Sequence, residues 1–264
     1  MLAGVSTASL YPLETEKAVS TLGDLGVRNI ELFANDTSEL EGDIKEQIKQ
    51  FISKNNMNVL SVHPFSSPLE THFLFSDYPR RVKTIVNIYR QYFEFAHDIG
   101  AKLFVLHGAY REARCTDATC VERYLMLSDI AADYGITIAQ ENVHYCRSGS
   151  IEFLKYMQRE SGGRAKFVLD IKQAVRAGYD PKEVVKALGS DIIHIHVSDN
   201  KPGADCLPVG KGTYDIAGLI SELNAVGFIG GLIVELYRRN YGEYTELTDS
   251  VKRLENIIAL YDKG

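Results

Sequence analysis

Eight short stretches of the chain are almost continuously apolar and rich in β-branched residues. Each has about the length of a β-strand, and such continuous apolarity is typical of strands buried on both faces of a parallel sheet. The eight stretches are residues 2–6, 28–33, 58–63, 102–107, 136–141, 166–171, 192–197 and 232–236.

Between these stretches, apolar residues recur with helical spacing. Residues 43–54, 79–97 and 251–261 each present one apolar face, as amphipathic helices do. A glycine repeatedly follows such a face and precedes the next strand, which is the usual signal for the end of a helix. These glycines are Gly26, Gly100, Gly135 and Gly227.

Strand and helix patterns therefore alternate eight times along the chain. The 264 residues divided by eight give about 33 residues per unit, which suits a βα unit. No linker or low-complexity segment divides the chain, so we predict a single α/β domain over residues 1–264, a (β/α)8 TIM barrel. The alternative is an open doubly wound sheet. That fold needs a glycine-rich first turn, and residues 5–10 contain no glycine.

Seven of the eight predicted strands contain an ionisable residue at or near the C-terminal end. In a barrel these ends meet at the face that holds the active site. Buried charges need a compensating partner, and a divalent metal is the simplest one. Taken singly, each residue also has a structural explanation, as a hydrogen-bonded histidine or a glutamate paired with an arginine. The seven are Glu31, His63, His107, Glu141, Asp170, His196 and Glu235.

The other histidines receive weaker assignments. His194 lies two residues deeper than His196 on the same strand face, and we expect it in the core or supporting the site. No function is assigned to His72, His97 and His144, which lie in helical or loop context.

Four segments resemble strands five to eight of the xylose-isomerase-like TIM barrels. They are Ile-Ala-Gln-Glu141-Asn, Val-Leu-Asp170-Ile-Lys-Gln173, His196-Val-Ser-Asp199-Asn and Ile-Val-Glu235-Leu-Tyr, and a Pro-Val-Gly-Lys-Gly-Thr-Tyr-Asp loop follows the third. This superfamily contains sugar and sugar-phosphate isomerases, tagatose-type ketose 3-epimerases, inosose and dehydroshikimate dehydratases, and endonuclease IV.

The resemblance implies a mononuclear metal site made by Glu141, Asp170, His196 and Glu235. Three carboxylates and one imidazole favour Mn²⁺ or Mg²⁺, with Mn²⁺ as the first expectation, and are also compatible with Co²⁺ or Zn²⁺. In the resembling 3-epimerases the two glutamates also serve as the acid/base pair. We therefore expect Glu141 and Glu235 to be catalytic.

The implied function is a metal-dependent sugar or sugar-phosphate isomerase or epimerase. It would abstract a proton next to a carbonyl and form a metal-stabilised enediolate. The alternative is a dehydratase of the inosose or dehydroshikimate type, which begins with the same proton abstraction. A non-catalytic binding barrel ranks below both.

An endonuclease IV-like nuclease is disfavoured on two grounds. Its trinuclear zinc site needs histidines where this chain has Gln173 and Cys206. The chain also has 35 acidic against 29 basic residues, a net charge of −6, whereas nucleic-acid binders usually have a basic excess. We expect a small-molecule partner and no nucleic acid.

Further residues near the strand ends are candidates for binding substrate: His63, His107, Glu31, Lys172, Gln173 and Arg238. Glu31 would bind a hydroxyl or orient a histidine. Strand alternation would put Lys172 on the same face as Asp170, where it would reach substrate or screen the carboxylates. Arg238 would bind an anionic group or simply be solvated. The aromatic segment 64–79 is expected to form either a lid over the site or a subunit interface.

The remaining features set the cellular context. No apolar run approaches the ~18 residues of a membrane span, and no signal peptide is expected at the N-terminus. The four cysteines have no CxxC spacing. We therefore expect a cytoplasmic protein. Barrels of this kind often pair, so we also expect a homodimer or homotetramer.

Overall fold

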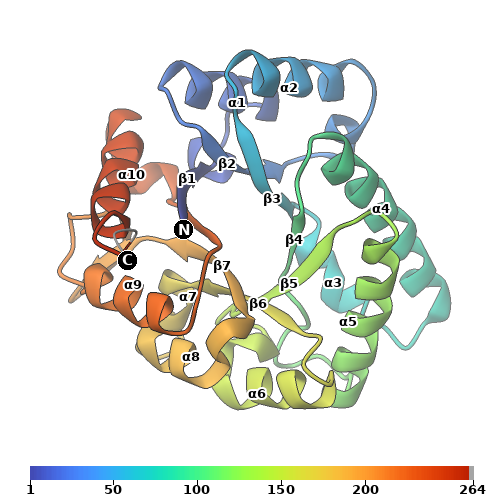
Figure 1. Ribbon diagram of the computed structural model, residues 1–264. Helices are drawn as coiled ribbons and strands as arrows, with labels where there is room; N and C mark the ends of the chain where they lie inside the picture. Colours follow the sequence, from blue (N-terminus) through green and yellow to red (C-terminus); the bar gives the residue numbers. More distant parts are fainter. Residues whose placement is uncertain (262–264) are drawn as a thin grey trace.

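Eight parallel strands close into a barrel in the computed structural model, which describes residues 1–261 (Figure 1). The order around the barrel is β1-β10-β7-β6-β5-β4-β3-β2, and β1 pairs with β2 to close it. The predicted barrel is therefore confirmed, and the open-sheet alternative is wrong. The barrel strands are β1 Leu2–Ser6, β2 Asn29–Ala34, β3 Asn58–Pro64, β4 Leu103–Leu106, β5 Thr137–Glu141, β6 Lys166–Asp170, β7 Ile192–Val197 and β10 Gly231–Val234.

Helices surround the strands in Figure 1 and cover their outer faces. The helices are α1 Thr15–Asp24, α2 Gly42–Lys54, α3 Ser67–Phe73, α4 Pro79–Asp98, α5 Asp117–Ala132, α6 Ile151–Glu160, α7 Ile171–Arg176, α8 Pro181–Leu188, α9 Ile216–Ala225 and α10 Thr245–Ile258. Short 3-10 helices cover Thr7–Leu10, Thr37–Leu40, Arg147–Gly149, Gly189–Asp191 and Arg238–Asn240, and a hairpin of β8 Asp199–Lys201 and β9 Ala204–Leu207 follows β7. Within residues 1–261, no helix combines the length and apolarity needed to cross a membrane.

The predicted helices agree with α2, α4 and α10, and the glycines that follow helices adopt the expected conformation. Gly26 and Gly100 both have φ of +81°, and the space beside each α-carbon is open. Glycine reaches this left-handed region without steric cost, which allows the chain to leave α1 and α4 and enter the next strand.

The barrel interior contains an apolar layer below a polar one. Val105, Ala139 and Val168 belong to a small buried cluster inside the ring of strands. Val168 lies beside His194 in register, and Gly231 is the partner of His194 on the other side. A β-carbon on Gly231 would lie 3.0 Å from the His194 ring, so this glycine leaves room for an imidazole in the lumen.

The hydroxyl of Tyr124 joins α5 to the two strands that end in Glu141 and Asp170. It donates to the Ile138 carbonyl of β5 at 2.7 Å and accepts from the Lys166 amide of β6 at 3.0 Å. We expect Tyr124→Phe to lower the free energy of unfolding by about 1–3 kcal/mol, because a buried amide and carbonyl lose their partner. Urea unfolding measures this, with Tyr156→Phe on α6 as the control; equal midpoints for the two variants would contradict it.

Candidate functional site

Four side chains with metal-binding chemistry meet at the C-terminal end of the barrel. Glu141 and Asp170 are the last residues of β5 and β6, His196 is the penultimate residue of β7, and Glu235 directly follows β10. His196 Nδ1 lies 3.4 Å from Glu141 Oε1, 3.6 Å from Asp170 Oδ2 and 3.6 Å from Glu235 Oε2. Residues up to 94 positions apart in the sequence, 141 to 235, thus face one point.

This arrangement fits a divalent cation. Ligand atoms that share a divalent ion at bond lengths of about 2.0–2.2 Å lie roughly 3–3.5 Å from one another, close to the spacing around His196 Nδ1. Nδ1 is buried and, among the described residues, has no hydrogen-bond partner. Buried polar atoms are normally satisfied, so an unpartnered nitrogen facing three carboxylates is chemically suited to binding a cation. The Glu141, Asp170 and His196 group can hold a metal.

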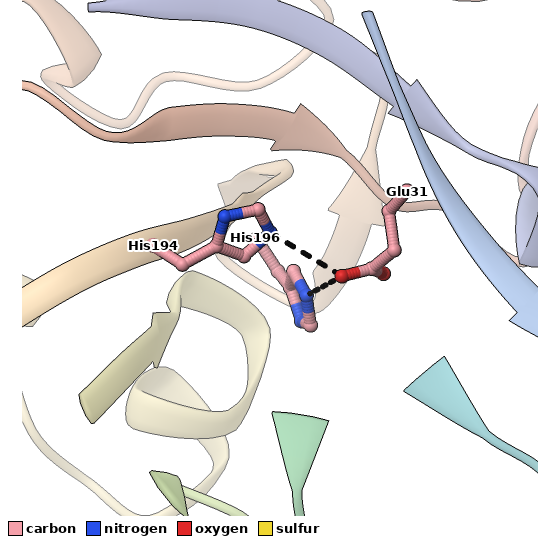
Figure 2. A group of neighbouring side chains, drawn as sticks. All are labelled: Glu31, His194 and His196. Carbon is pink, nitrogen blue, oxygen red and sulfur yellow. Dashed lines mark hydrogen bonds and ion pairs between the residues drawn. The ribbon is translucent and has the colours of Figure 1, made fainter. Parts of the chain in front are cut away.

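Glu31 contacts both His196 and His194 through its carboxylate (Figure 2). One carboxylate oxygen, Oε2, lies 3.0 Å from His196 Nε2 and 3.3 Å from His194 Nε2, and it accepts from Ser61 Oγ at 2.7 Å. Burial by itself raises the pKa of Glu31, but the two imidazoles hold it well below its usual value. A carboxylate on Nε2 directs the Nδ1 lone pair toward the other ligands, as carboxylates commonly do for metal-bound histidine.

Asp170 also caps the N-terminus of α7. Its Oδ1 accepts the backbone N–H of Gln173 at 3.1 Å, which leaves Oδ2 directed at the site. Lys172 lies in the first turn of α7, and its Nζ contacts both Asp170 Oδ2 and Glu235 Oε2. Strand alternation does not explain the position of Lys172, because β6 ends at Asp170. The side chain nevertheless reaches the carboxylates, as expected. Burial alone would lower the pKa of Lys172; Asp170 and Glu235 raise it well above the usual value.

A cavity of about 510 Å³ opens above these groups. Among the predicted site residues, His63, His107, Glu141, Lys172, Gln173 and Glu235 line it, whereas Glu31, Asp170 and His196 do not. Aromatic rings form much of its wall, and the Tyr11 and Tyr237 side chains at the mouth are exposed. The full lining is Ala8, Tyr11, Phe33, Asn35, His63, Phe65, His107, Glu141, Tyr145, Lys172, Gln173, Arg176, Glu235, Leu236 and Tyr237.

The two histidines of β3 and the β4 end lie together beside Glu141. His107 Nε2 is 2.9 Å from both His63 Nε2 and Glu141 Oε2, and His63 Nδ1 is 3.2 Å from the carbonyl of Pro64. On the other side of the cavity, Gln173 Oε1 is held by His144, whose Nδ1 lies 2.6 Å away. His144, for which no role was predicted, therefore orients this glutamine.

Arg238 is the predicted substrate-binding residue that the structure places elsewhere. Its guanidinium stacks on Tyr241 and Tyr244 and donates to the Tyr241 carbonyl at 2.9 Å. The arginine at the cavity is Arg176, at the end of α7, which sequence analysis missed. Arg176 donates to both carboxylate oxygens of Asp205, at 2.6 and 3.1 Å, and to the Tyr237 hydroxyl at 2.9 Å.

Residues 19–257 match the family model described as xylose isomerase-like TIM barrel. The chain belongs to this family. An uncharacterized protein of Mycobacterium leprae is 26% identical over 94% of this chain and 95% of its own length. The 3-dehydroshikimate dehydratase of Pseudomonas aeruginosa is 20% identical over 100% of this chain but only 42% of that enzyme.

Solved structures of the same barrel extend the comparison. A D-tagatose 3-epimerase-like protein superposes with a TM-score of 0.82 at 21% identity, covering 100% of this chain and 99% of the other. The IOLI protein with a bound zinc atom gives a TM-score of 0.74 at 18% identity, covering 99% and 98%. At these identities the likeness establishes the fold alone. The bound zinc atom belongs to the IOLI protein.

Asp199 organises the loop of residues 208–215, the Pro-Val-Gly-Lys-Gly-Thr-Tyr-Asp segment that follows β7 and the β8-β9 hairpin. The Asp199 carboxylate accepts the backbone N–H groups of Gly210 and Gly212 at 2.9 Å and of Tyr214 at 3.2 Å. Cys206, one of the two departures from endonuclease IV, is buried, and its Sγ lies 3.7 Å from the Glu235 carbonyl. It therefore supports the backbone of a candidate ligand.

The segment 64–79 contains a group that sequence analysis did not single out. Only Phe65 of its aromatic residues lines the cavity, whereas Phe75 is buried in the core. Glu70 on α3 is fully buried; it accepts the Tyr89 hydroxyl at 2.7 Å and the Gly108 N–H, next to His107, at 2.5 Å. It thus positions the β4 end. Its signal in the sequence was a carboxylate within a segment rich in aromatic residues.

Burial raises the pKa of Glu70 to about 7. Between its ordinary value of 4.5 and about 7, the unfolded chain releases this proton while the folded chain retains it, so stability falls as pH rises. We expect Glu70→Gln to remove a decrease of roughly 3 kcal/mol across this window. Urea unfolding of both proteins at several pH values measures the difference; parallel pH profiles would contradict the assignment.

Proposed function

We propose that the protein is a divalent-metal-dependent isomerase or epimerase of a small polyhydroxy ketone. One observation carries the proposal: of the four candidate ligands, only Glu141 and Glu235 line the cavity, while Asp170 and His196 lie beneath it. Asp170 and His196 would help to hold an ion without reaching the cavity, and the two residues that do reach it, Glu141 and Glu235, are bases.

The donor set supports Mn²⁺ as the first choice of ion, because three carboxylates and one imidazole form an oxygen-rich site. When bound, such an ion supplies Lewis-acid chemistry that polarises a substrate carbonyl and acidifies the adjacent C–H. The protein residues then handle the proton.

Glu141 and Glu235 act as a proton-transfer pair in this proposal. They stand on β5 and after β10, three positions apart around the eight-stranded ring, so they approach a bound substrate from different sides. One carboxylate removes the proton from carbon and the other returns a proton to the opposite face, which inverts the centre. His63 and His107 lie beside Glu141, and in this proposal they hydrogen-bond substrate hydroxyls.

The charges around the cavity favour a neutral sugar over a sugar phosphate. Among its fifteen lining residues the cationic side chains are Lys172 and Arg176, and each is already paired with carboxylates: Asp170 and Glu235 for the lysine, Asp205 for the arginine. The lining glutamates would repel a phosphate. A volume of about 510 Å³ and aromatic walls suit one small sugar.

A dehydratase is the second candidate. The observation that favours it is the similarity to the 3-dehydroshikimate dehydratase of Pseudomonas aeruginosa along the whole chain. Both reactions begin with proton abstraction beside a carbonyl, and the same two glutamates would perform it. Loss of water with a new conjugated absorbance identifies the dehydratase, whereas a changed stereocentre without water loss identifies the epimerase.

Glu141→Gln and Glu235→Gln should each slow exchange of the substrate C–H with D₂O by about 10²–10⁴-fold, because each variant loses one proton-transfer group. NMR with a panel of ketoses and cyclic ketones in the presence of Mn²⁺ measures the exchange. The exposed Glu160→Gln on α6 is the control and should exchange at the wild-type rate. Wild-type exchange in either site variant would refute the two-base scheme.

Neutral ketoses should be turned over in preference to their phosphate esters, because the lining carboxylates Glu141 and Glu235 repel a phosphate and Arg176 is paired with Asp205. The measurement is kcat/KM for each ketose and its phosphate, together with inhibition by inorganic phosphate, which we expect to be absent at millimolar concentration. A phosphate ester that reacts faster than its parent sugar would show that Arg176 exchanges Asp205 for the substrate.

A further inference from the structure

Lys172 and a divalent ion require the same two oxygen atoms. Nζ contacts Asp170 Oδ2 and Glu235 Oε2, and these are the two oxygens that stand 3.6 Å from His196 Nδ1. An ion bound between His196, Asp170 and Glu235 would therefore share both oxygens with the ammonium group.

The Lys172 ammonium and a divalent ion would repel each other strongly if both occupied this site. The Lys172 side chain is 5% exposed and the Asp170 side chain 1%, so little water screens the repulsion between a single and a double positive charge. The short α7 places Lys172 only two residues after the ligand Asp170, which keeps the ammonium at the site unless its side chain changes rotamer.

We propose that Lys172 is a built-in competitor for the divalent ion: its ammonium neutralises Asp170 and Glu235 in the metal-free protein, and an incoming ion displaces it. The inference rests on the metal site of the proposed function and adds a residue that sets the affinity of that site. The Tyr237 ring on the cavity wall has its centroid 5.9 Å from Nζ in the carboxylate-bound position, so a displaced ammonium could move toward the face of this ring.

The test is Mn²⁺ affinity without substrate, measured by isothermal titration calorimetry at one pH on wild type, Lys172→Met and Lys172→Arg. Removing the charge should tighten Mn²⁺ binding by roughly 10- to 100-fold, the range by which neighbours of metal ligands change affinity. Lys172→Arg keeps a cation and should bind as weakly as the wild type.

Lys166→Met is the matched control. It removes a lysine that is paired with Asp191 at the opposite end of β6, and Mn²⁺ affinity should not change. Because Lys172→Met leaves two buried carboxylates unpaired, its metal-free fold is expected to be weaker. A second measurement covers this case: added Mn²⁺ should raise the Tm of Lys172→Met more than that of the wild type.

The outcomes separate this inference from the proposed function. Equal Mn²⁺ affinity in wild type and Lys172→Met, or no binding by either, overturns the competition. Tighter binding by Lys172→Met supports it, including the case in which only the variant binds. If the variant binds more tightly and no ketone undergoes proton exchange with the wild type, the competition stands and the proposed reaction fails.

Discussion

Compensation of four carboxylates, three buried and one partly buried, at one end of the barrel is the constraint on which the rest of the site depends. Glu31, Glu141, Asp170 and Glu235 are taken out of water by the strands that bear them, and a buried charge is costly without a partner. Each has one. Imidazoles and Ser61 contact Glu31, His107 contacts Glu141, and Lys172 contacts the remaining two. Among the described residues, the buried basic side chains Lys172, His63, His194 and His196 all lie next to these carboxylates.

The depth of each carboxylate decides what it can do. Glu31 lies below His196 and holds the imidazole, so it acts on the site through another side chain rather than on a substrate. Asp170 has one oxygen committed to the N-terminus of α7. Glu141 and Glu235 alone reach the cavity. Acidic residues on these strand ends thus differ in what they contact: Glu31 the two histidines, Asp170 the start of α7, and Glu141 and Glu235 the cavity.

Much of this site was predictable because β-strands impose a simple geometry. Continuous apolar runs identified the strands, and parallel strands bring their C-terminal ends together, so Glu141, Asp170, His196 and Glu235 were expected to converge. Depth was harder to predict. Glu31 was expected either to orient a histidine or to bind a substrate hydroxyl; it is the third residue of the six-residue β2, contacts His196 and His194, and does not line the cavity. A pattern of apolar residues does not reveal where a strand crosses the polar layer.

Residues whose role depends on a loop conformation escaped prediction for a different reason. Arg176 reaches the cavity because α7 starts at Ile171, immediately after β6, whereas strand alternation was assumed to continue through Lys172. Glu70 acts on Gly108, 38 residues away, from a helix in a segment that was expected to be a lid or an interface. In both cases the deciding contact joins elements whose relative placement is a property of the closed barrel. Local sequence patterns do not report such contacts, and the same holds for Lys172, whose two carboxylate partners lie 2 and 63 residues away.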